Sequence, residues 1–392
     1  MEQHLLKQSP RIEVVDALRG FAVMAIILVH NLEHFIFPVY PTHTPGWLDA
    51  LDQGVFNVVF TLFAGKAYAI FALLFGFTFY VQSNNREKQN KDFGYRFLWR
   101  LVLLAGFATV NAAFFPAGDV LLLFVVVGLV LFFTRHWSDK AVFIAAVIFL
   151  LQPVEWFHYI AHLLNPSHQL PDLNVSQMYA EVAEYTKSGN FGAFILGNIT
   201  LGQKASLLWA VNAGRFFQTA GLFLLGFYLG RKQLFVYSEA HSRLWVRILV
   251  FSAIAFAPLY SLKELVMASD AIVQQTAGTA FDMWQKLAFT LVLVASFVIL
   301  YQSKAFSNMV GDLRFYGKMS LTNYITQSVV GSVIYFPFGL YLAPYCGYTL
   351  SLCIGWMVFL LQVAFCKWWL GKHKQGPLEY IWHKWTWIGT KK

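Results

Sequence analysis

The feature that most restricts the fold is an apolar stretch near the N-terminus, residues 14–34, in which Asp16, Arg19, His30 and His34 are four of the five ionisable side chains. A helix turns by about 100° and rises by about 1.5 Å per residue, so Arg19 and His30 differ by only about 20° around the axis and by about 16 Å along it. Asp16 and His34 lie within about 40° of His30 on the same helix. The other faces consist of Phe, Val, Met, Ile and Leu. These four groups therefore share one stripe of a mainly apolar helix.

This stripe must face protein or water, because a charge exposed to lipid costs several kcal/mol. Arginine stays charged there, whereas histidine exchanges a proton near neutral pH. One interpretation is structural: Asp16 and Arg19 form an ion pair at a helix start, and His30 bonds a neighbouring helix. The other is chemical. We predict that His30 and Asp16 are catalytic and that Arg19, Asn31 and His34 bind substrate.

The rest of the chain has the composition of a membrane protein. Hydrophobic residues make up 58% and charged residues 12%, an apolar share that no soluble domain needs. Ten apolar segments are long enough, or nearly so, to cross about 30 Å of hydrocarbon. They are residues 17–37, 62–82, 97–115, 119–134, 141–161, 214–230, 246–262, 284–302, 319–341 and 348–370. We expect an all-α polytopic membrane protein with about ten transmembrane helices.

Basic residues predict the orientation of these helices. Alternate loops are rich in Lys and Arg, while the loops between them are nearly free of both, as the positive-inside rule requires. Both termini are then cytoplasmic, and the formal charge of +9 is a topology signal rather than a nucleic-acid footprint. The basic segments contain Lys7 and Arg11; Arg86, Lys88, Lys91, Arg96 and Arg100; Arg135 and Lys140; Arg231, Lys232, Arg243 and Arg247; Lys304, Arg314 and Lys318; and Lys372, Lys374, Lys384, Lys391 and Lys392.

The long segment between the fifth and sixth predicted spans divides the chain into three parts. We expect residues 1–160 to form N-terminal helices that carry the ionisable stripe, residues 161–213 to be extracytoplasmic or interfacial, and residues 214–392 to form C-terminal helices with an amphipathic tail. An interfacial helix is expected at residues 48–63, which are apolar but contain aspartates.

Three further charges interrupt apolar segments. Lys66 must reach the interface or meet an anion, and we predict that it lines a pocket. Asp119 either caps its helix or faces the outer site. Arg215 is an outward arginine against the positive-inside trend, which favours a buried partner such as Asp119 or a bound anion. All three are candidate substrate-binding residues.

The ninth segment carries a polar face. Ser320, Asn323, Tyr324, Gln327 and Ser328 lie at offsets 0, 3, 4, 7 and 8, which is one side of a helix. Such a face either bonds a neighbouring helix or walls a cavity. We predict that Asn323, Tyr324 and Gln327 contribute to substrate binding and face the first or second span.

Several motifs resemble known membrane families. "DALRGFAVMAIILVHN" (16–31) resembles the opening helix of membrane acyltransferases, in which Arg, ten residues and His recur. "YGKMSLTNYITQSVVGSVIYF" (316–336) and "WWLGKHKQGPLEYIWHKWTW" (368–387) are similar to the end of the YeiB-like bacterial membrane proteins, named for domain of unknown function 418. Residues 65–79 and 118–129 are also similar to that family, so the resemblance covers nearly the whole chain.

The resemblance implies an integral membrane acyltransferase of the bacterial inner membrane. It would move an acyl group from a cytoplasmic thioester, acetyl-CoA or another acyl-CoA, to an extracytoplasmic glycan, lipid or small molecule. A transporter or flippase and a structural envelope protein are the alternatives. Membrane lipids are expected partners and nucleic acid is not; a homodimer is one of the oligomeric states left open. Cys346, Cys353 and Cys366 have no metal-site spacing, and no metal is expected.

Overall fold

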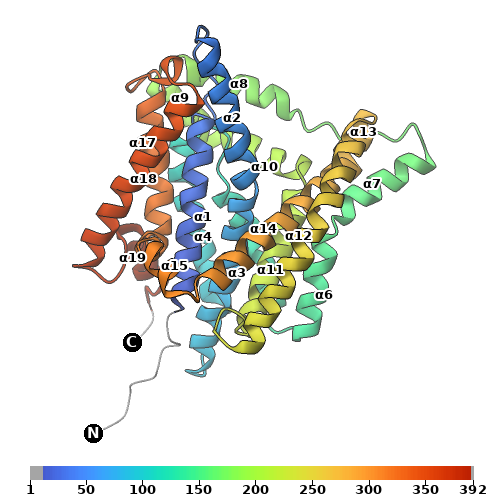
Figure 1. Cartoon of the computed structure of the whole chain (residues 1–392), viewed down its shortest axis with the longest axis vertical. Helices are drawn as coiled ribbons and strands as arrows, with labels where there is room; N and C mark the ends of the chain where they lie inside the picture. The colour runs from blue at the N-terminus through green and yellow to red at the C-terminus, as the bar shows by residue number, and fades with distance from the viewer. Residues whose placement is uncertain (1–11, 390–392) are drawn as a thin grey trace.

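The computed structural model describes residues 12–389, and every regular element in that range is a helix, so the predicted all-α class is confirmed (Figure 1). The predicted basic residues Lys7, Arg11, Lys391 and Lys392 lie outside the described residues. The helices are α1 (Glu13–Leu32), α2 (Gly46–Phe63), α3 (Lys66–Glu87), α4 (Gly94–Phe114), α5 (Leu121–Thr134), α6 (Asp139–Leu150), α7 (Pro153–Leu164), α8 (Val175–Lys187), α9 (Phe191–Gly197), η1 (Asn198–Gly202), α10 (Gln203–Asn212), α11 (Arg215–Arg231), α12 (Glu239–Met267), α13 (Ala271–Val273), η2 (Gln274–Gly278), α14 (Thr279–Leu300), α15 (Lys304–Met309), α16 (Leu313–Lys318), α17 (Ser320–Tyr335), η3 (Ala343–Tyr345), α18 (Tyr348–Leu370) and α19 (Pro377–Thr386).

Helix α1 lies at the centre, between the α17–α18 pair and the α2–α3 segment (Figure 1). Glycines let it approach α16 closely: a Cβ on Gly20 would overlap the carbonyl of Leu313, and one on Gly317 would overlap the carbonyl of Asp16. Small residues at such contacts give membrane helices the backbone proximity that drives their association. Helix α1 ends at Leu32, short of the expected 37, because residues 34–36 take left-handed backbone angles.

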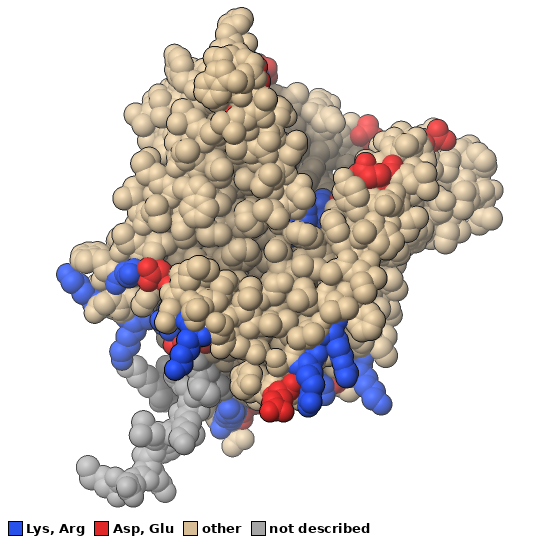
Figure 2. All heavy atoms as spheres, viewed as in Figure 1, with Lys and Arg blue, Asp and Glu red and all other residues tan. Residues whose placement is uncertain are grey.

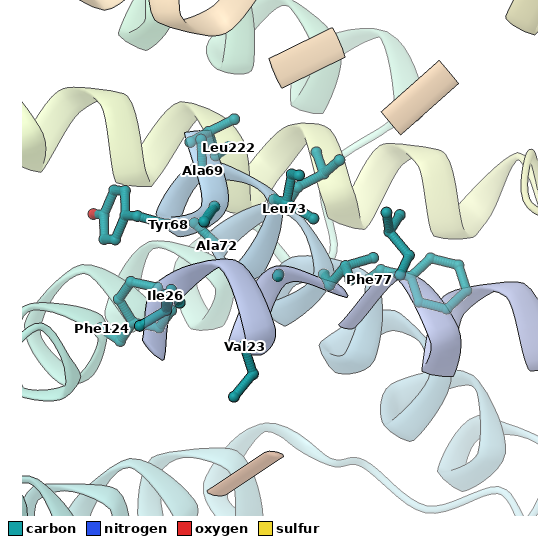
Figure 3. Packing of buried hydrophobic residues seen from close by; sticks show 14 of the residues in the cluster. Val23, Ile26, Tyr68, Ala69, Ala72, Leu73, Phe77, Phe124 and Leu222 are labelled. Atoms are coloured by element: carbon teal, nitrogen blue, oxygen red, sulfur yellow. The ribbon is translucent and has the colours of Figure 1, made fainter. Parts of the chain in front are cut away.

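Helices α3 and α11 form a second close pair, and they run parallel. Gly76 meets the backbone of Phe223, and Gly226 meets the backbone of Leu73, so neither position has room for a Cβ. Figure 3 shows α3 residues between α1 and α11 in the buried core, with Leu222 of α11 next to Ala69. The pairing places the starts of α3 and α11 at one level.

Within residues 12–389, five helices are long and apolar enough to cross a membrane, or six if the bent pair α6–α7 is one span. The chain is therefore a membrane protein. Two predicted segments differ from expectation. The interfacial helix expected at 48–63 instead belongs to one apolar helical segment of 42 residues, Gly46–Glu87, that runs through α2 into α3. The span expected at 141–161 bends by 47° between α6 and α7, at the left-handed residue Gln152.

Charges are distributed unevenly on the surface. Figure 2 shows Lys and Arg gathered along the lower edge, below a broad face almost free of charge. The start of α1 and helix α19 lie at that lower level in Figure 1, while α8–α10 lie at the opposite level. Helix α8, η1 and α10 pack together over the outer ends of α4 and α5. The interior thus has one basic end and one end covered by short helices.

Candidate functional site

Three hollows enter the described part of the chain, and two of them are lined by ionisable residues of α1. The larger, of about 830 Å³, lies toward the end covered by α8 and α10, and we call it the outer hollow. The smaller, of about 260 Å³, lies toward the basic end, and we call it the inner hollow. His30 lines the outer hollow and Arg19 lines the inner one. The predicted stripe of α1 therefore serves two cavities.

His30 contacts aromatic rings rather than hydrogen-bonding groups. Its ring centre lies 4.6 Å from that of Phe115, 5.7 Å from that of Phe35 and 6.4 Å from that of Tyr324. Its Nδ1 is buried and has no hydrogen-bond partner among the described residues. The imidazole is thus packed on its sides and keeps a nitrogen that no protein group occupies. This is not the helix-to-helix bond of the structural interpretation.

Asp119 begins a hydrogen-bonded chain beside His30. Its carboxylate accepts the backbone N–H groups of Leu121 (3.2 Å) and Leu122 (3.2 Å), so it caps α5 as the first alternative predicted. It also accepts from Asn111 Nδ2 at 2.8 Å, and Asn111 Oδ1 accepts from Ser328 Oγ at 2.8 Å. Asp119 lines the outer hollow as well, so both predicted roles hold in one place.

Arg19 is held in the inner hollow. Its guanidinium donates to Asp16 Oδ1 at 3.2 Å and to Thr78 Oγ1 at 2.9 Å. Asp16 itself lines neither hollow, so its contact with the site runs through Arg19. Three more basic side chains line the inner hollow, from α4, α16 and the segment before α19: Arg100, Lys318 and Lys374. The inner hollow is accordingly strongly basic.

A thin aromatic layer separates the hollows. Tyr324 of α17 lines the inner hollow, yet its ring is 6.4 Å from His30, which lines the outer one. Phe71 stacks on Tyr324 at 6.4 Å, and Phe124 lies 5.9 Å from Phe71. The Tyr324 hydroxyl has no hydrogen-bond partner among the residues that the structure describes.

Basic residues also gather on one wall of the outer hollow. Arg215 and Lys286 line it, and Lys66 follows Gly65, which lines it too. Arg215 does not pair with Asp119, contrary to one of our two predictions. Within residues 12–389 it forms no ion pair, and its Nε is buried without a partner. Its guanidinium instead lies over the rings of Tyr68 (4.5 Å) and Trp209 (5.5 Å).

Two predicted α1 residues lie elsewhere. Asn31 Oδ1 accepts from Tyr335 Oη at 2.9 Å, and its Nδ2 donates to the Ile27 carbonyl at 2.8 Å. His34 is fully buried, with Nε2 2.7 Å from Ser351 Oγ and with Tyr335 stacked on its ring at 4.4 Å. Both line neither hollow, because α17 and α18 cover this side of α1.

The polar face of α17 also divides. Tyr324 faces the first span as predicted, but Asn323 donates to the Tyr316 carbonyl at 3.0 Å and to Cys366 Sγ at 3.3 Å, so it faces α16 and α18 instead. Gln327 is fully buried, lines neither hollow, and has no partner for either amide atom within the described chain.

Some lining residues were not predicted. Lys286 lies in an apolar segment, so the rule that flagged Lys66 would also have flagged it. Arg100 was assigned to a cytoplasmic loop because it follows other basic residues. Glu33 is ionisable and lies in the opening apolar stretch, so the rule that flagged His30 would also have flagged it. Tyr68 and Ser206 gave no signal, because only the packing of α3 and α10 brings them to the outer hollow. Within residues 12–389 no group of three or more His, Cys, Asp or Glu side chains could hold a metal ion.

Comparisons with known proteins agree on one family. A family model described as "Protein of unknown function (DUF418)" matches residues 229–389. "Uncharacterized protein YxaH" of Bacillus subtilis (strain 168) is 26% identical, over 97% of this chain and 95% of its own. "Uncharacterized protein YeiB" of Escherichia coli (strain K12) is 25% identical, over 95% of each chain. A 39.9 kDa protein encoded in the amylase 3′ region of Bacillus acidopullulyticus is 23% identical, over 96% and 94%. No solved structure matches the chain.

Proposed function

The chain belongs to the YeiB-like DUF418 family of membrane proteins, and from its two hollows we propose that it transfers an acyl group across the bacterial inner membrane. The donor is a cytoplasmic coenzyme A thioester and the acceptor is extracytoplasmic. One observation carries the proposal: Arg19 and His30 stand on one helix, in two hollows that only a thin aromatic layer separates.

The proposal includes an orientation. The basic edge in Figure 2 is cytoplasmic by the positive-inside rule, so both termini are cytoplasmic and α8–α10 are outside. The ten predicted apolar segments all contain helices, and we propose that each crosses or nearly crosses the membrane. The inner hollow then opens to the cytoplasm and the outer hollow to the outer leaflet and beyond.

The inner hollow suits the acyl end of a thioester. Its volume of about 260 Å³ is smaller than the pockets of about 300–1,000 Å³ that hold drug-sized ligands, so only the acyl end and the adjoining arm can enter. Arg19, Arg100, Lys318 and Lys374 supply positive charge for the phosphates that remain nearer the surface. Movement of the Tyr324 ring would bring the thioester carbonyl toward His30.

His30 is placed to act as the general base. An acceptor hydroxyl or amine in the outer hollow attacks the thioester carbonyl carbon, and His30 takes its proton. The carbon–sulfur bond then breaks, and the thiolate leaves toward the cytoplasm with that proton. Asp119, which lines the same hollow and is held by Asn111 and Ser328, orients the acceptor.

Purified protein tests this directly. Acyl-CoA thioesters of several chain lengths are mixed with the protein and envelope extract, and free thiol and acylated product are measured together. We expect product from the parent protein, and a raised donor KM in Arg19→Ala because a phosphate contact is lost. Absence of thiol release and of product with every thioester would exclude acyl transfer.

Transport is the second candidate, and a specific observation favours it. Hollows from both sides that meet at a thin layer also occur in transporters. The chain also has a bent helix pair, α6–α7, as transporters do, but neither helix lines a hollow. Proteoliposomes separate the two functions: uptake of an envelope solute without thioester would support transport, whereas acyl transfer without uptake supports the enzyme.

A further inference from the structure

The cationic wall of the outer hollow has no role in the acyl-transfer step. It consists of Arg215 of α11 and Lys286 of α14, which line the hollow, together with Lys66 of α3, which follows the lining residue Gly65 but is not itself in the lining. Lys66 is only 6% exposed and forms neither a hydrogen bond nor an ion pair with any described residue; its Nζ lies 5.5 Å from the Phe289 ring centre. Unpaired buried cations are costly in a membrane and indicate a ligand of opposite charge.

The carboxylates nearby do not neutralise this wall. Asp282 pairs with Lys286 at 2.5 Å, whereas neither Lys66 nor Arg215 forms an ion pair with a described residue. Glu33 lines the hollow from the α1 side, but it forms no ion pair with Arg215 in the part of the chain that the structure describes. Asp119 is bonded to Asn111 and to the start of α5. Arg215 therefore faces the cavity without an ion-pair partner among the described residues.

Backbone geometry adds to the positive potential. Lys66 and Arg215 are the first residues of α3 and α11, and each follows a glycine in the left-handed conformation, Gly65 (φ +76°) and Gly214 (φ +63°). Neither helix start has a side-chain cap. A Cβ on Gly214 would lie 3.1 Å from Glu155 Oε1, so a carboxylate already lies beside the start of α11. At the start of α3 the neighbours of Gly65 are Lys286 and Arg215, so its first N–H groups are free for an anion, which the helix dipole favours there. A phosphate, with several acceptor oxygens, suits these donors and the planar arginine fork better than a single carboxylate does.

The depth of the wall indicates where the phosphate comes from. On α3, Lys66 is twenty residues from Arg86, which is a distance of about 30 Å along the helix axis. On α11, Arg215 is sixteen residues from Arg231, which is about 24 Å along the axis. Arg86 and Arg231 belong to the basic end, so the wall lies near the far boundary of a hydrocarbon layer of about 30 Å. Figure 2 shows a basic group in a hollow on the side of the molecule, between the upper lobe and the arm that contains α12 and α14. A lipid in the outer leaflet can reach it sideways.

We propose that the outer hollow binds the phosphate of an anionic outer-leaflet lipid on Lys66, Arg215 and Lys286. Phe60 and Phe63 of α2, which line the same hollow, contact the first methylene groups of its chains. That this lipid is the acyl acceptor rests on the proposed function; that it binds does not.

Binding to the purified protein in neutral detergent tests the proposal. The probes are phosphatidic acid, diacylglycerol with the same chains, and glycerol 3-phosphate. We expect phosphatidic acid to bind and to raise Tm, because a ligand of the native state stabilises it. Diacylglycerol lacks the phosphate and glycerol 3-phosphate lacks the chains, so both should bind weakly. Equal affinity for diacylglycerol would overturn the phosphate site, and equal affinity for glycerol 3-phosphate would overturn the lipid source.

Variants make the assignment specific. Arg215→Gln should weaken phosphatidic acid binding by about 10- to 100-fold, the loss typical of one hydrogen bond to a charged group. Arg243→Gln, the same change at an exposed position of the basic end, is the matched control and should bind as the parent does. Lys66→Met separates a loss of binding from a loss of folding. It should raise the Tm of the lipid-free protein, because it removes an unpaired buried charge, and it should still weaken lipid binding. Parental affinity in both Arg215→Gln and Lys66→Met would overturn the site. None of these outcomes depends on acyl transfer.

Discussion

Two histidines of α1, four residues apart, show how one residue type takes two roles. His34 is fixed by hydrogen bonds to Ser351 Oγ (2.7 Å) and the Val39 carbonyl (2.9 Å), and two tyrosine rings stack on it. His30 lines a cavity; its buried Nδ1 has no partner, and its other ring nitrogen, Nε2, forms no hydrogen bond with a described residue. A group whose bonds are all made stabilises the fold, whereas a group with a free nitrogen at a cavity can take part in chemistry.

Replacement of each histidine by alanine should separate these roles. His30→Ala should lose acyl transfer by about 10²- to 10⁴-fold, the usual size of general acid–base assistance, with little change in Tm. His34→Ala leaves a cavity and should cost about 2–5 kcal/mol of stability. Rates with a thioester donor and thermal unfolding in detergent measure both effects. Parental transfer by His30→Ala would remove His30 from the mechanism.

At the scale of elements, glycine contacts decide which helices pair. A Cβ at Gly76 or Gly226 would strike the backbone of the facing helix, so the α3–α11 pair exists only with glycine there. Gly106 of α4 has open space around its Cβ position. The pairing also holds Lys66 and Arg215 side by side, so it serves the site as well as the fold.

Gly226→Ala should therefore prevent normal folding or lower Tm severely, because a backbone contact cannot move aside as a side chain can. Gly106→Ala is the matched control in a helix interior, and it should be neutral or stabilise by up to about 1 kcal/mol. Size-exclusion profiles and thermal unfolding of both variants check this. A well-folded Gly226→Ala protein would contradict the close packing of α3 and α11.

The tail helix α19 is attached through one carboxylate. Glu379 Oε1 accepts the backbone N–H groups of Leu321 (2.8 Å) and Thr322 (3.0 Å), and Oε2 accepts the Thr322 hydroxyl (2.6 Å), so a distant residue caps α17. Trp382 donates to the Arg100 carbonyl at 3.2 Å and fastens the same helix to α4. Through these contacts α19 forms part of the wall of the inner hollow.

Glu379→Ala should lower the free energy of unfolding by about 0.5–2 kcal/mol, the range for a lost helix cap, and expose the tail to protease.

Burial raises the pKa of Glu379, although its hydrogen bonds with Thr322 and Leu321 oppose the shift. A carboxyl whose pKa is raised in the folded state stabilises the fold most while it is protonated. Its contribution to the free energy of unfolding is lost as the pH rises from 4.5, the ordinary pKa of this group, through its folded-state pKa. Unfolding of the parent and of Glu379→Gln across that range should show the parent losing stability relative to the glutamine variant. Parallel curves would contradict the shift.

At the scale of the whole molecule, the basic edge and the short-helix end define two sides. Thr42, between α1 and α2, and Lys91, between α3 and α4, are both exposed and lie on opposite sides in the proposed orientation. Both cysteine variants are made in a Cys353→Ser background, because Cys353 is the exposed native thiol. On intact cells, a thiol reagent that cannot cross the membrane should label Thr42→Cys and should not label Lys91→Cys. Lysed cells should show labelling of both. The reverse pattern would place the basic edge outside.

The sequence by itself determined that this is an all-helical membrane protein, because apolar length and charge pattern follow from the solvent around each segment rather than from its neighbours. It also determined that Arg19 and His30 share a face of α1, because helical geometry is local. The resemblance to the YeiB-like family followed from motifs at both ends of the chain.

Only the tertiary structure decided which of these groups meet a cavity. Periodicity places a residue on one side of its own helix, but it does not say which helix faces that side: α17 and α18 cover Asn31 and His34, whereas the outer hollow reaches His30. The cationic wall was equally hidden, because Lys66 and Arg215 are 149 positions apart and meet only through glycine packing between α3 and α11. Contacts between distant segments depend on the shapes of both surfaces, and no single segment contains that information.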